Sequence, residues 1–320
     1  GVTKIEIAGP GYINLFFKRD EFFRQLFSRS TSSDPKGNSA GSKVIVEHTN
    51  INPNKAAHIG HLRNAVLGDT FARMLRFKGE EVEIQNYIDD TGVQVADVVV
   101  GFQHLAKMNL EQIKAIPGKF DYYCWDLYAK VASFYELAPE NPKLRGEALK
   151  HLEEGNNPTA EIAHFVAHKI VQCHIETMWR LGISYDLLPK ESDILHLKFW
   201  NYAFELLKER NAIHFETSGK NQGCWIMRGA EKNNSIVSDP AAETEKEFDE
   251  DKIIVRSNGT VTYVGKDIAY QLWKFGLLGR DFRYRPFFSY ADGRTVWAST
   301  TEGVEKPFGR AAEVFNVIDS

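Results

Sequence analysis

The sequence predicts an α/β fold in which a doubly wound parallel sheet is interrupted by a mostly helical insertion. Three observations predict it. A β-branched run at Lys43–Glu47 leads through a polar loop into a helical pattern that runs from about His58 to just before Gly79. The strand-like segment Glu81–Ile88 follows, and a βαβ unit of this length requires a parallel sheet. From Phe102 to about Leu197 the pattern is mostly helical, so this stretch separates two halves of the sheet.

The start of the first helix places two histidines where an anion would bind. His58 and His61 are three residues apart and therefore lie on one face, while Gly60 between them leaves room for a ligand to approach the backbone. Free N–H groups at a helix N-terminus, together with two imidazole donors, form a site for phosphate. The helix itself is predicted from apolar residues spaced four apart, Leu67, Phe71 and Leu75.

Periodicity and turn residues predict the later elements. The expected helices are Glu161–Leu181, which is the longest, Phe199–Arg210, and Lys266–Phe275 with Asp267 in its first turn. The expected strands are Cys224–Met227, Ile253–Arg256, Val261–Tyr263 after an Asn-Gly turn at Ser257–Thr260, and Phe315–Ile318.

Composition predicts where the chain is divided. Residues 28–42 are rich in Ser and Gly and form a flexible linker, so residues 1–27 are separate from the main domain at 43–320. The aromatic residues before the linker are expected to pack as core residues against the next domain. The acidic segment Asn233–Lys252 is expected to be a solvated loop.

Overall composition excludes several classes of protein. The 320 residues carry a net charge of −4, so RNA would be bound only through local patches or through parts outside this sequence. Cys124, Cys173 and Cys224 lie far apart without a CxxC pair, which fits reduced thiols in a cytosol-like compartment and no zinc site. There is no run of eighteen apolar residues and no signal peptide. Both ends look cut, so the sequence is interpreted as a fragment.

Four motifs together resemble the arginyl branch of the class I aminoacyl-tRNA synthetases. The first is His58-Ile59-Gly60-His61, preceded by Asn52-Pro53-Asn54-Lys55 and by Glu47 at the end of a strand. The others, in the order the family has them, are Gly9–Phe17, Gln85–Ala96 and Arg256–Tyr270. The resemblance implies a Rossmann-like catalytic domain with an insertion at about 101–185, a remnant of a tRNA-contacting domain at 1–27, and an anticodon-binding domain that is absent here.

The resemblance also implies a reaction. Arginine and ATP, which brings Mg²⁺, give arginyl-adenylate and pyrophosphate, and arginine then passes to the 3′ end of its tRNA. The family's location would be cytoplasmic and the protein a monomer, with no metal held by the protein itself. His58, Gly60 and His61 would bind ATP, and Lys55 would neutralise pyrophosphate in place of the KMSK loop, which is absent from the sequence.

Arginine is a planar cation with five donors, so its site needs carboxylates that accept in pairs. The family places such groups at Glu47 and Asp267, with Tyr263 nearby and Asn52 at the polar end of the amino acid. Strand ends on one edge of a parallel sheet meet, so residues far apart in sequence can face one guanidinium. By the same resemblance Asp90 and Gln94 line the pocket and Asn14 and Phe17 contact tRNA, Phe17 by stacking.

Other interpretations stay open at this point. His58 and His61 could be capping or surface residues, Lys55 a solvated lysine, Glu47 a solvated strand end and Asp267 a helix cap, while Asp90 could belong to an ordinary turn. His164 and His168 have a spacing that could share a metal, but a solvated helix face is expected instead. The whole fragment could bind arginine or ATP without turnover, or be another HxGH nucleotidyl transferase.

Overall fold

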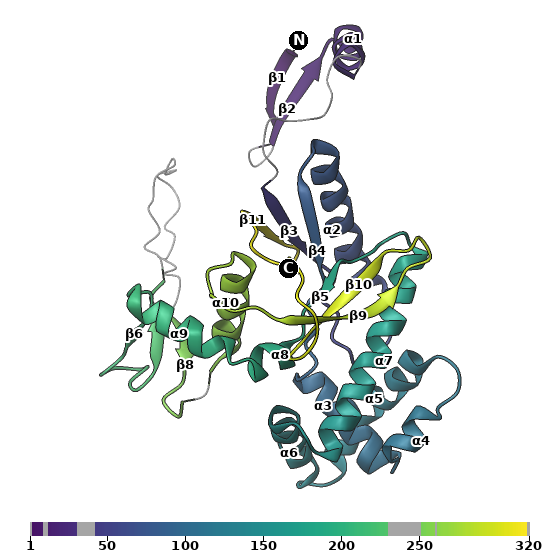
Figure 1. Ribbon diagram of the computed structural model, residues 1–320, viewed down its shortest axis with the longest axis vertical. Helices are drawn as coiled ribbons and strands as arrows, with labels where there is room; N and C mark the ends of the chain where they lie inside the picture. The colour runs from purple at the N-terminus through teal and green to yellow at the C-terminus, as the bar shows by residue number, and fades with distance from the viewer. Residues whose placement is uncertain (1, 9–11, 31–41, 230–250, 260, 319–320) are drawn as a thin grey trace.

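The computed structural model describes residues 2–8, 12–30, 42–229, 251–259 and 261–318. Its central feature is a sheet of order β11-β3-β4-β5-β10-β9 (Figure 1). The first five strands run parallel and β9 is antiparallel to β10, which confirms the predicted α/β class. The strands are β3 (Lys43–Glu47), β4 (Glu81–Gln85), β5 (Leu187–Leu188), β9 (Arg283–Ser289), β10 (Thr295–Thr300) and β11 (Glu313–Asn316).

One face of the sheet is covered by α2 (Ile59–Lys78) and α7 (Pro158–Arg180), whose side chains join the strand residues in one core. Helix α2 begins and ends as predicted, with His58 as its N-cap and Gly79, at φ 99°, as its C-cap. The residues it buries are small, namely Ala65, Gly68 and Ala72, so the helix lies close to the sheet. Leu67, one of the apolar residues from which this helix was predicted, is not buried but 54% exposed.

The opposite face is covered by three helices, α8 (Glu191–His196), α9 (Phe199–Glu209) and α10 (Tyr263–Lys274). Their buried side chains form a second core with Leu187 of β5 and Tyr284 of β9. Because both faces are covered, β3 is apolar at Val44, Ile45 and Val46, whereas β4 alternates and buries the polar Glu83 and Gln85. A small antiparallel sheet lies beside α9, formed by β6 (His214–Phe215), β7 (Trp225–Met227) and β8 (Lys252–Val255).

The return strand predicted at Val261–Tyr263 is wrong. Val261 makes only an isolated bridge to Val255, and helix α10 begins at Tyr263. The reason is Thr262, which caps the helix with extended backbone while its hydroxyl donates to the Ile253 carbonyl at 2.8 Å. Tyr263 and Asp267 are therefore four residues apart on one helix and share a face.

The helical insertion enters after β4 and returns to the sheet at β5 (Figure 1). Its helices surround a core of their own, to which Val95–Val100 contribute buried side chains. The predicted longest helix at Glu161–Leu181 is confirmed as α7. The insertion contains α3 (Val93–Val100), the π-helical turn η1 (Gly101–Leu105), α4 (Leu110–Lys114), α5 (Phe120–Leu137), α6 (Asn141–Glu154) and α7.

The N-terminal segment forms a hairpin of β1 (Val2–Ala8) and β2 (Tyr12–Phe17), followed by α1 (Arg19–Ser30). It stands beyond the end of the sheet in Figure 1. Its five phenylalanines are all exposed, Phe16 by 44%, Phe17 and Phe22 by 42%, Phe23 by 54% and Phe27 by 68%. The expectation that the aromatic residues before the linker are core residues is therefore wrong within the described chain.

Some predictions fall outside the described residues. They are the first three residues of the Gly9–Phe17 motif, most of the linker at 28–42, most of the acidic segment Asn233–Lys252, and Thr260 at the end of the Asn-Gly turn. Among the helices that the structure does describe, none is long and apolar enough to cross a membrane.

Candidate active site

Two stacked imidazoles stand at the N-terminus of α2. The rings of His58 and His61 are 3.7 Å apart between centroids and inclined by 19°. The His58 backbone N–H donates to Nδ1 of His61 at 3.3 Å, so a neutral His61 carries its proton on Nε2. In that tautomer Nε2 of His61 is a donor at the N-terminus of the helix.

Gly60 makes room for this arrangement in a way the sequence did not indicate. A Cβ built on Gly60 would lie 3.1 Å from Cε1 of His58, so the missing side chain leaves space for the imidazole itself. Lys55 lies near the same pair, with its ammonium 5.7 Å from the ring centre of Trp125 and 5.5 Å from that of Tyr128. Trp125 also contacts the His58 ring edge-on, so Lys55 and the paired imidazoles share one aromatic neighbour on α5.

Glu47 ends β3 with a buried carboxylate that already has two partners. Its Oε1 accepts a hydrogen bond from Asn50 Nδ2 at 2.8 Å, and its Oε2 lies 2.6 Å from the ammonium of Lys274 on α10. Lys274 is fully buried and also donates to Asn316 Oδ1 of β11 at 3.0 Å. Burial lowers the pKa of Lys274, whereas the charge of Glu47 opposes that change.

A cluster of carboxyl groups lies next to this pair. Asp89 follows β4, Glu191 opens α8, and Asp267 lies on α10. Burial raises the pKa of Asp89 to about 8, helped by a hydrogen bond and charge repulsion from Glu191. Partial burial likewise raises the pKa of Asp267 to about 6, with further contributions from Glu191 and Glu47. Burial, followed by the closeness of neighbouring charges, therefore favours the protonated form of Asp89 and of Asp267.

Two observations indicate that these groups converge on one place. Burial raises the pKa of Tyr87 well above its usual value, and the charges of Glu191, Asp89 and Asp267 raise it further. The ammonium of Lys266 lies 2.7 Å from Glu191 Oε1. Counted with Glu47 and Lys274, the cluster holds four carboxyl groups and two ammonium groups. Carboxyl groups thus outnumber ammonium groups, and a further cation would be favoured among them.

The family model for the catalytic domain of class I (R) tRNA synthetases matches residues 25–276. The chain belongs to this family. Arginine-tRNA ligase from Thermococcus kodakarensis is 40% identical over 329 residues, covering 97% of the chain and 48% of the relative. The ligase from Thermococcus sibiricus is 36% identical over 332 residues, covering 100% of the chain and 50% of the relative.

Solved structures agree with these matches. Thermus thermophilus arginyl-tRNA synthetase superposes with a TM-score of 0.70 at 30% identity, covering 98% of this chain and 48% of that one. The Plasmodium falciparum enzyme, at 16% identity and a TM-score of 0.55, supports the fold alone. This member of the class I synthetases thus spans about half the length of the curated relatives it matches.

Sequence reasoning missed Asp89, Glu191, Lys266 and Lys274 in this synthetase domain. A signal was present for two of them, since Asp89 and Glu191 directly follow the ends of neighbouring strands, where ligands bind in α/β sheets. In the structure Gly92 leaves space for Asp89, because a Cβ at Gly92 would lie 2.4 Å from a carboxylate oxygen of Asp89. Nothing in the sequence indicated the buried lysine Lys274.

Asp90 points away from the carboxyl cluster of the synthetase domain. Its two oxygens accept hydrogen bonds from the backbone N–H of Ser192 at 2.9 Å and from the Ser192 hydroxyl at 2.6 Å. This holds α8 and so positions the neighbouring Glu191. Gln94 is half-buried near the start of α3, and Asn52 is half-buried in the loop after β3. A contact of Asp90, Gln94 or Asn52 with arginine remains a prediction.

Of the remaining predicted residues, Tyr263 adjoins the cluster, since its ring centre lies 5.6 Å from the ammonium of Lys266. Tyr263 is 61% exposed at the first position of α10, where its ring can meet a ligand above Asp267. Asn14 and Phe17 lie on β2 with exposed side chains. In the part of the synthetase domain that the structure describes, no group of three or more His, Cys, Asp or Glu side chains is arranged to hold a metal.

Proposed function

We propose that this chain is the catalytic part of an arginine-tRNA ligase. In this proposal it activates L-arginine with ATP and Mg²⁺ to arginyl-adenylate and transfers the arginine to the 3′ end of its tRNA. One observation carries the proposal: carboxyl groups from β3, the β4 exit, α8 and α10 outnumber the cations among them. An arginine guanidinium supplies the missing charge.

The acidic cluster would select arginine through its geometry. Asp267 and Tyr263 share a face of α10, and Glu47 approaches from β3, so a planar guanidinium would donate hydrogen bonds to groups on two elements. Lys274 fixes the orientation of the Glu47 carboxylate. A lysine substrate would leave some of these carboxyl groups without a hydrogen bond, which is costly in a partly buried site.

The imidazole pair would serve the phosphates. In the first step the arginine carboxylate attacks the α-phosphorus in line and pyrophosphate leaves, with no covalent enzyme intermediate. His58, His61 and the N–H groups of the first turn of α2 would donate to the phosphoryl oxygens as their charge grows, with Gly60 leaving space for the His58 ring. Lys55 would neutralise the leaving pyrophosphate.

Several finer assignments belong to the same proposal. Asn52, Asp90 and Gln94 would complete the arginine pocket, and the exposed Asn14 and Phe17 would contact tRNA. Residues 1–27 would be the remnant of a tRNA-contacting domain, 28–42 a linker, and 43–320 the catalytic domain with its insertion at about 101–185. The protein would act as a cytoplasmic monomer, consistent with the free Cys124, Cys173 and Cys224.

The test is arginine-dependent exchange of pyrophosphate into ATP by the 320-residue chain and by a version extended to the length of its relatives. Each is assayed with and without the cognate tRNA. We expect exchange with arginine and none with lysine. Arginine binding without exchange in both versions would make the fold a binding module, and exchange with a different carboxylate would make it another nucleotidyl transferase.

A further inference from the structure

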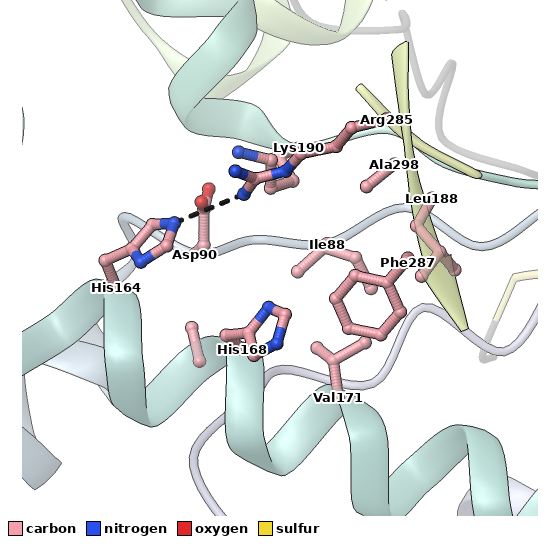
Figure 2. Close-up of a pocket in the computed structure, with 11 residues that line it drawn as sticks. Ile88, Asp90, His164, His168, Val171, Leu188, Lys190, Arg285, Phe287 and Ala298 are labelled. Carbon is pink, nitrogen blue, oxygen red and sulfur yellow. Dashed lines mark hydrogen bonds between the residues drawn. The ribbon is translucent and has the colours of Figure 1, made fainter. Parts of the chain in front are cut away.

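A pocket lies between α7 of the insertion and the sheet, where residues of β5, β9 and β10 line it. His164 and His168 reach into it from successive turns of α7, and Arg285 reaches in from β9 (Figure 2). Its floor is apolar, lined by Ile88, Val171, Leu188, Phe287 and Ala298. This small lobe, about 20 Å³, adjoins an open lobe of about 560 Å³, and the two share Asp90, His164, Lys190 and Arg285.

His168 does not lie on the solvated helix face that the sequence predicted. Its ring is half-buried and packs against Phe287 of β9, with 4.7 Å between ring centres. It is also parallel to His164, at an interplanar angle of 15° and a centroid distance of 6.3 Å. The His168 ring is thereby fixed in direction and forms part of a shaped pocket, whereas His164 is exposed on α7, as the sequence predicted.

The pocket carries an uncompensated cation. The guanidinium of Arg285 lies 3.5 Å from Nε2 of His164, and no carboxylate in the described chain forms an ion pair with it. Lys190, by contrast, is paired with Asp193 at 3.0 Å. A guanidinium without a carboxylate, beside two imidazoles that can be protonated, leaves positive potential that an anion would relieve.

The pKa shifts of the two histidines indicate the sign of the charge around them. Burial lowers the pKa of His168 to about 4, and the charges of His164, Arg285, Lys169 and Lys190 lower it further. Burial, Lys190 and Arg285 also lower the pKa of His164, against the weaker opposing effect of Asp90 and Asp193. Cations therefore dominate the field at both rings.

Three carboxyl groups line the two lobes: Asp90 lines both, while Glu161 and Asp193 line the open lobe, where Asp193 is paired with Lys190. Asp90 is buried, and burial raises its pKa, which weakens its charge. Both of its oxygens already accept hydrogen bonds from Ser192. Asp90 therefore opposes an anion only weakly, and it does not neutralise Arg285.

We propose that Arg285, His164 and His168 form a second anion subsite, which binds a phosphoryl group. Donors that approach from β9 and from two turns of α7 suit a tetrahedral anion, whose oxygens point in several directions, better than a planar carboxylate. The open lobe leaves room for whatever carries the phosphoryl group. The subsite goes beyond the proposed function and can be tested without turnover.

The first test follows the Cε1 protons of His164 and His168 by NMR as inorganic phosphate is added, with assignments from His164→Gln and His168→Gln. We expect both resonances to shift and the pKa of both rings to rise by about one unit, because an anion favours the charged imidazole. Phosphate at tens of millimolar that moves neither resonance would overturn the subsite.

The second test compares two arginines on the same strand. Arg285→Ala is expected to weaken phosphate binding by about tenfold or more, as for loss of a charge-assisted contact. Arg283→Ala is the matched control, since Arg283 lies two residues away and is paired with Glu305 at 2.5 Å. Equal loss in both variants would contradict the proposal. Arg285→Lys, which keeps the charge, should retain part of the affinity and so exclude misfolding as the cause.

The source of the phosphoryl group is decided by competition. Inorganic phosphate, pyrophosphate, ATP and a single-stranded RNA ending in CCA are each titrated against the wild-type chain and Arg285→Ala. Tighter, Arg285-dependent binding of the small anions would identify a free phosphate or nucleotide as the ligand. Tighter, Arg285-dependent binding of the RNA would identify its backbone. If arginine activation fails while these resonances still shift, the proposed function falls and the subsite stands.

Discussion

At the scale of single residues, the buried charges of this protein come in pairs drawn from distant segments. Lys274 of α10 holds Glu47 of β3, and Lys266 holds Glu191. A buried pair of this kind adds little net stability, but removal of one partner leaves the other charge without compensation. Each pair therefore fixes the direction of a carboxylate that the proposed arginine site depends on.

Replacement of Lys274 by Met is expected to lower the free energy of unfolding by about 3–5 kcal/mol, because the Glu47 carboxylate would stay buried without a cation. Urea denaturation measures this. Lys78→Met is the control, since Lys78 pairs with Glu80 at 3.1 Å with a side chain that is 72% exposed. Its loss should stay below about 1 kcal/mol. Similar losses in both variants would mean that Lys274 is not the counter-ion of Glu47.

Replacement of His58 or His61 by Ala should slow arginine activation by about a hundredfold to a thousandfold, as for loss of a donor aimed at a transition state. Pyrophosphate exchange into ATP is the assay. His151→Ala, an exposed histidine on α6, controls for general effects of removing an imidazole. A slowing of less than about threefold at both His58 and His61 would remove the imidazole pair from the mechanism.

At the scale of elements, local sequence signals predicted both ends of α2 but not which of its faces is buried. The cap residues His58 and Gly79 lie at the ends of α2, where the sequence indicated them. Apolar periodicity did not predict which residues of α2 are buried, because Leu67 is exposed while the smaller Gly68 packs against the sheet. The start of α10 depended on a contact from Thr262 to Ile253, which periodicity does not contain.

Replacement of Gly68 by Ala is expected to destabilise the fold by roughly 1–3 kcal/mol, because overpacking forces α2 away from the sheet. A Cβ at Gly68 would meet Cβ of the buried His48 at 2.3 Å. Gly146→Ala on α6 is the matched control, since nothing lies within 4 Å of its Cβ and Ala favours a helix by about 1 kcal/mol over Gly. Thermal unfolding should move in opposite directions for the two variants.

At the scale of the whole molecule, the site is assembled at the carboxyl edge of the sheet from segments that are distant in sequence. This much was predictable, because strand ends of a parallel sheet meet, and Glu47 does lie within reach of the charge of Asp267. The contributions of Asp89, Glu191 and the two lysines were not predictable, because they depend on which side chains turn inward. The assembly concentrates carboxyl groups, which makes the stability of the protein depend on pH.

The stability contributed by Asp89 and Asp267 is expected to fall as the pH rises from about 4 to about 8. Carboxyl groups in the unfolded chain titrate near pH 4, whereas the folded pKa is about 6 for Asp267 and about 8 for Asp89. Between these limits the two carboxyl groups bind more protons in the folded state than in the unfolded state, so their contribution to the slope of stability against pH is negative. Asp89→Asn should flatten the upper part of that slope. Asp292→Asn should not, because Arg294 lowers the pKa of Asp292 and moves its titration below this window.

Bound arginine should counteract this loss, because its guanidinium favours the ionised carboxyl groups. Its affinity is therefore expected to rise with pH, by at most about tenfold per unit for each proton released. Calorimetry at pH 6 and pH 8, in buffers of different ionisation enthalpy, measures both the affinity and the protons released. Asp89→Asn should reduce the proton release at pH 7 to 8 while arginine still binds. An affinity for arginine that does not change with pH would mean that the carboxyl cluster is not where the guanidinium binds.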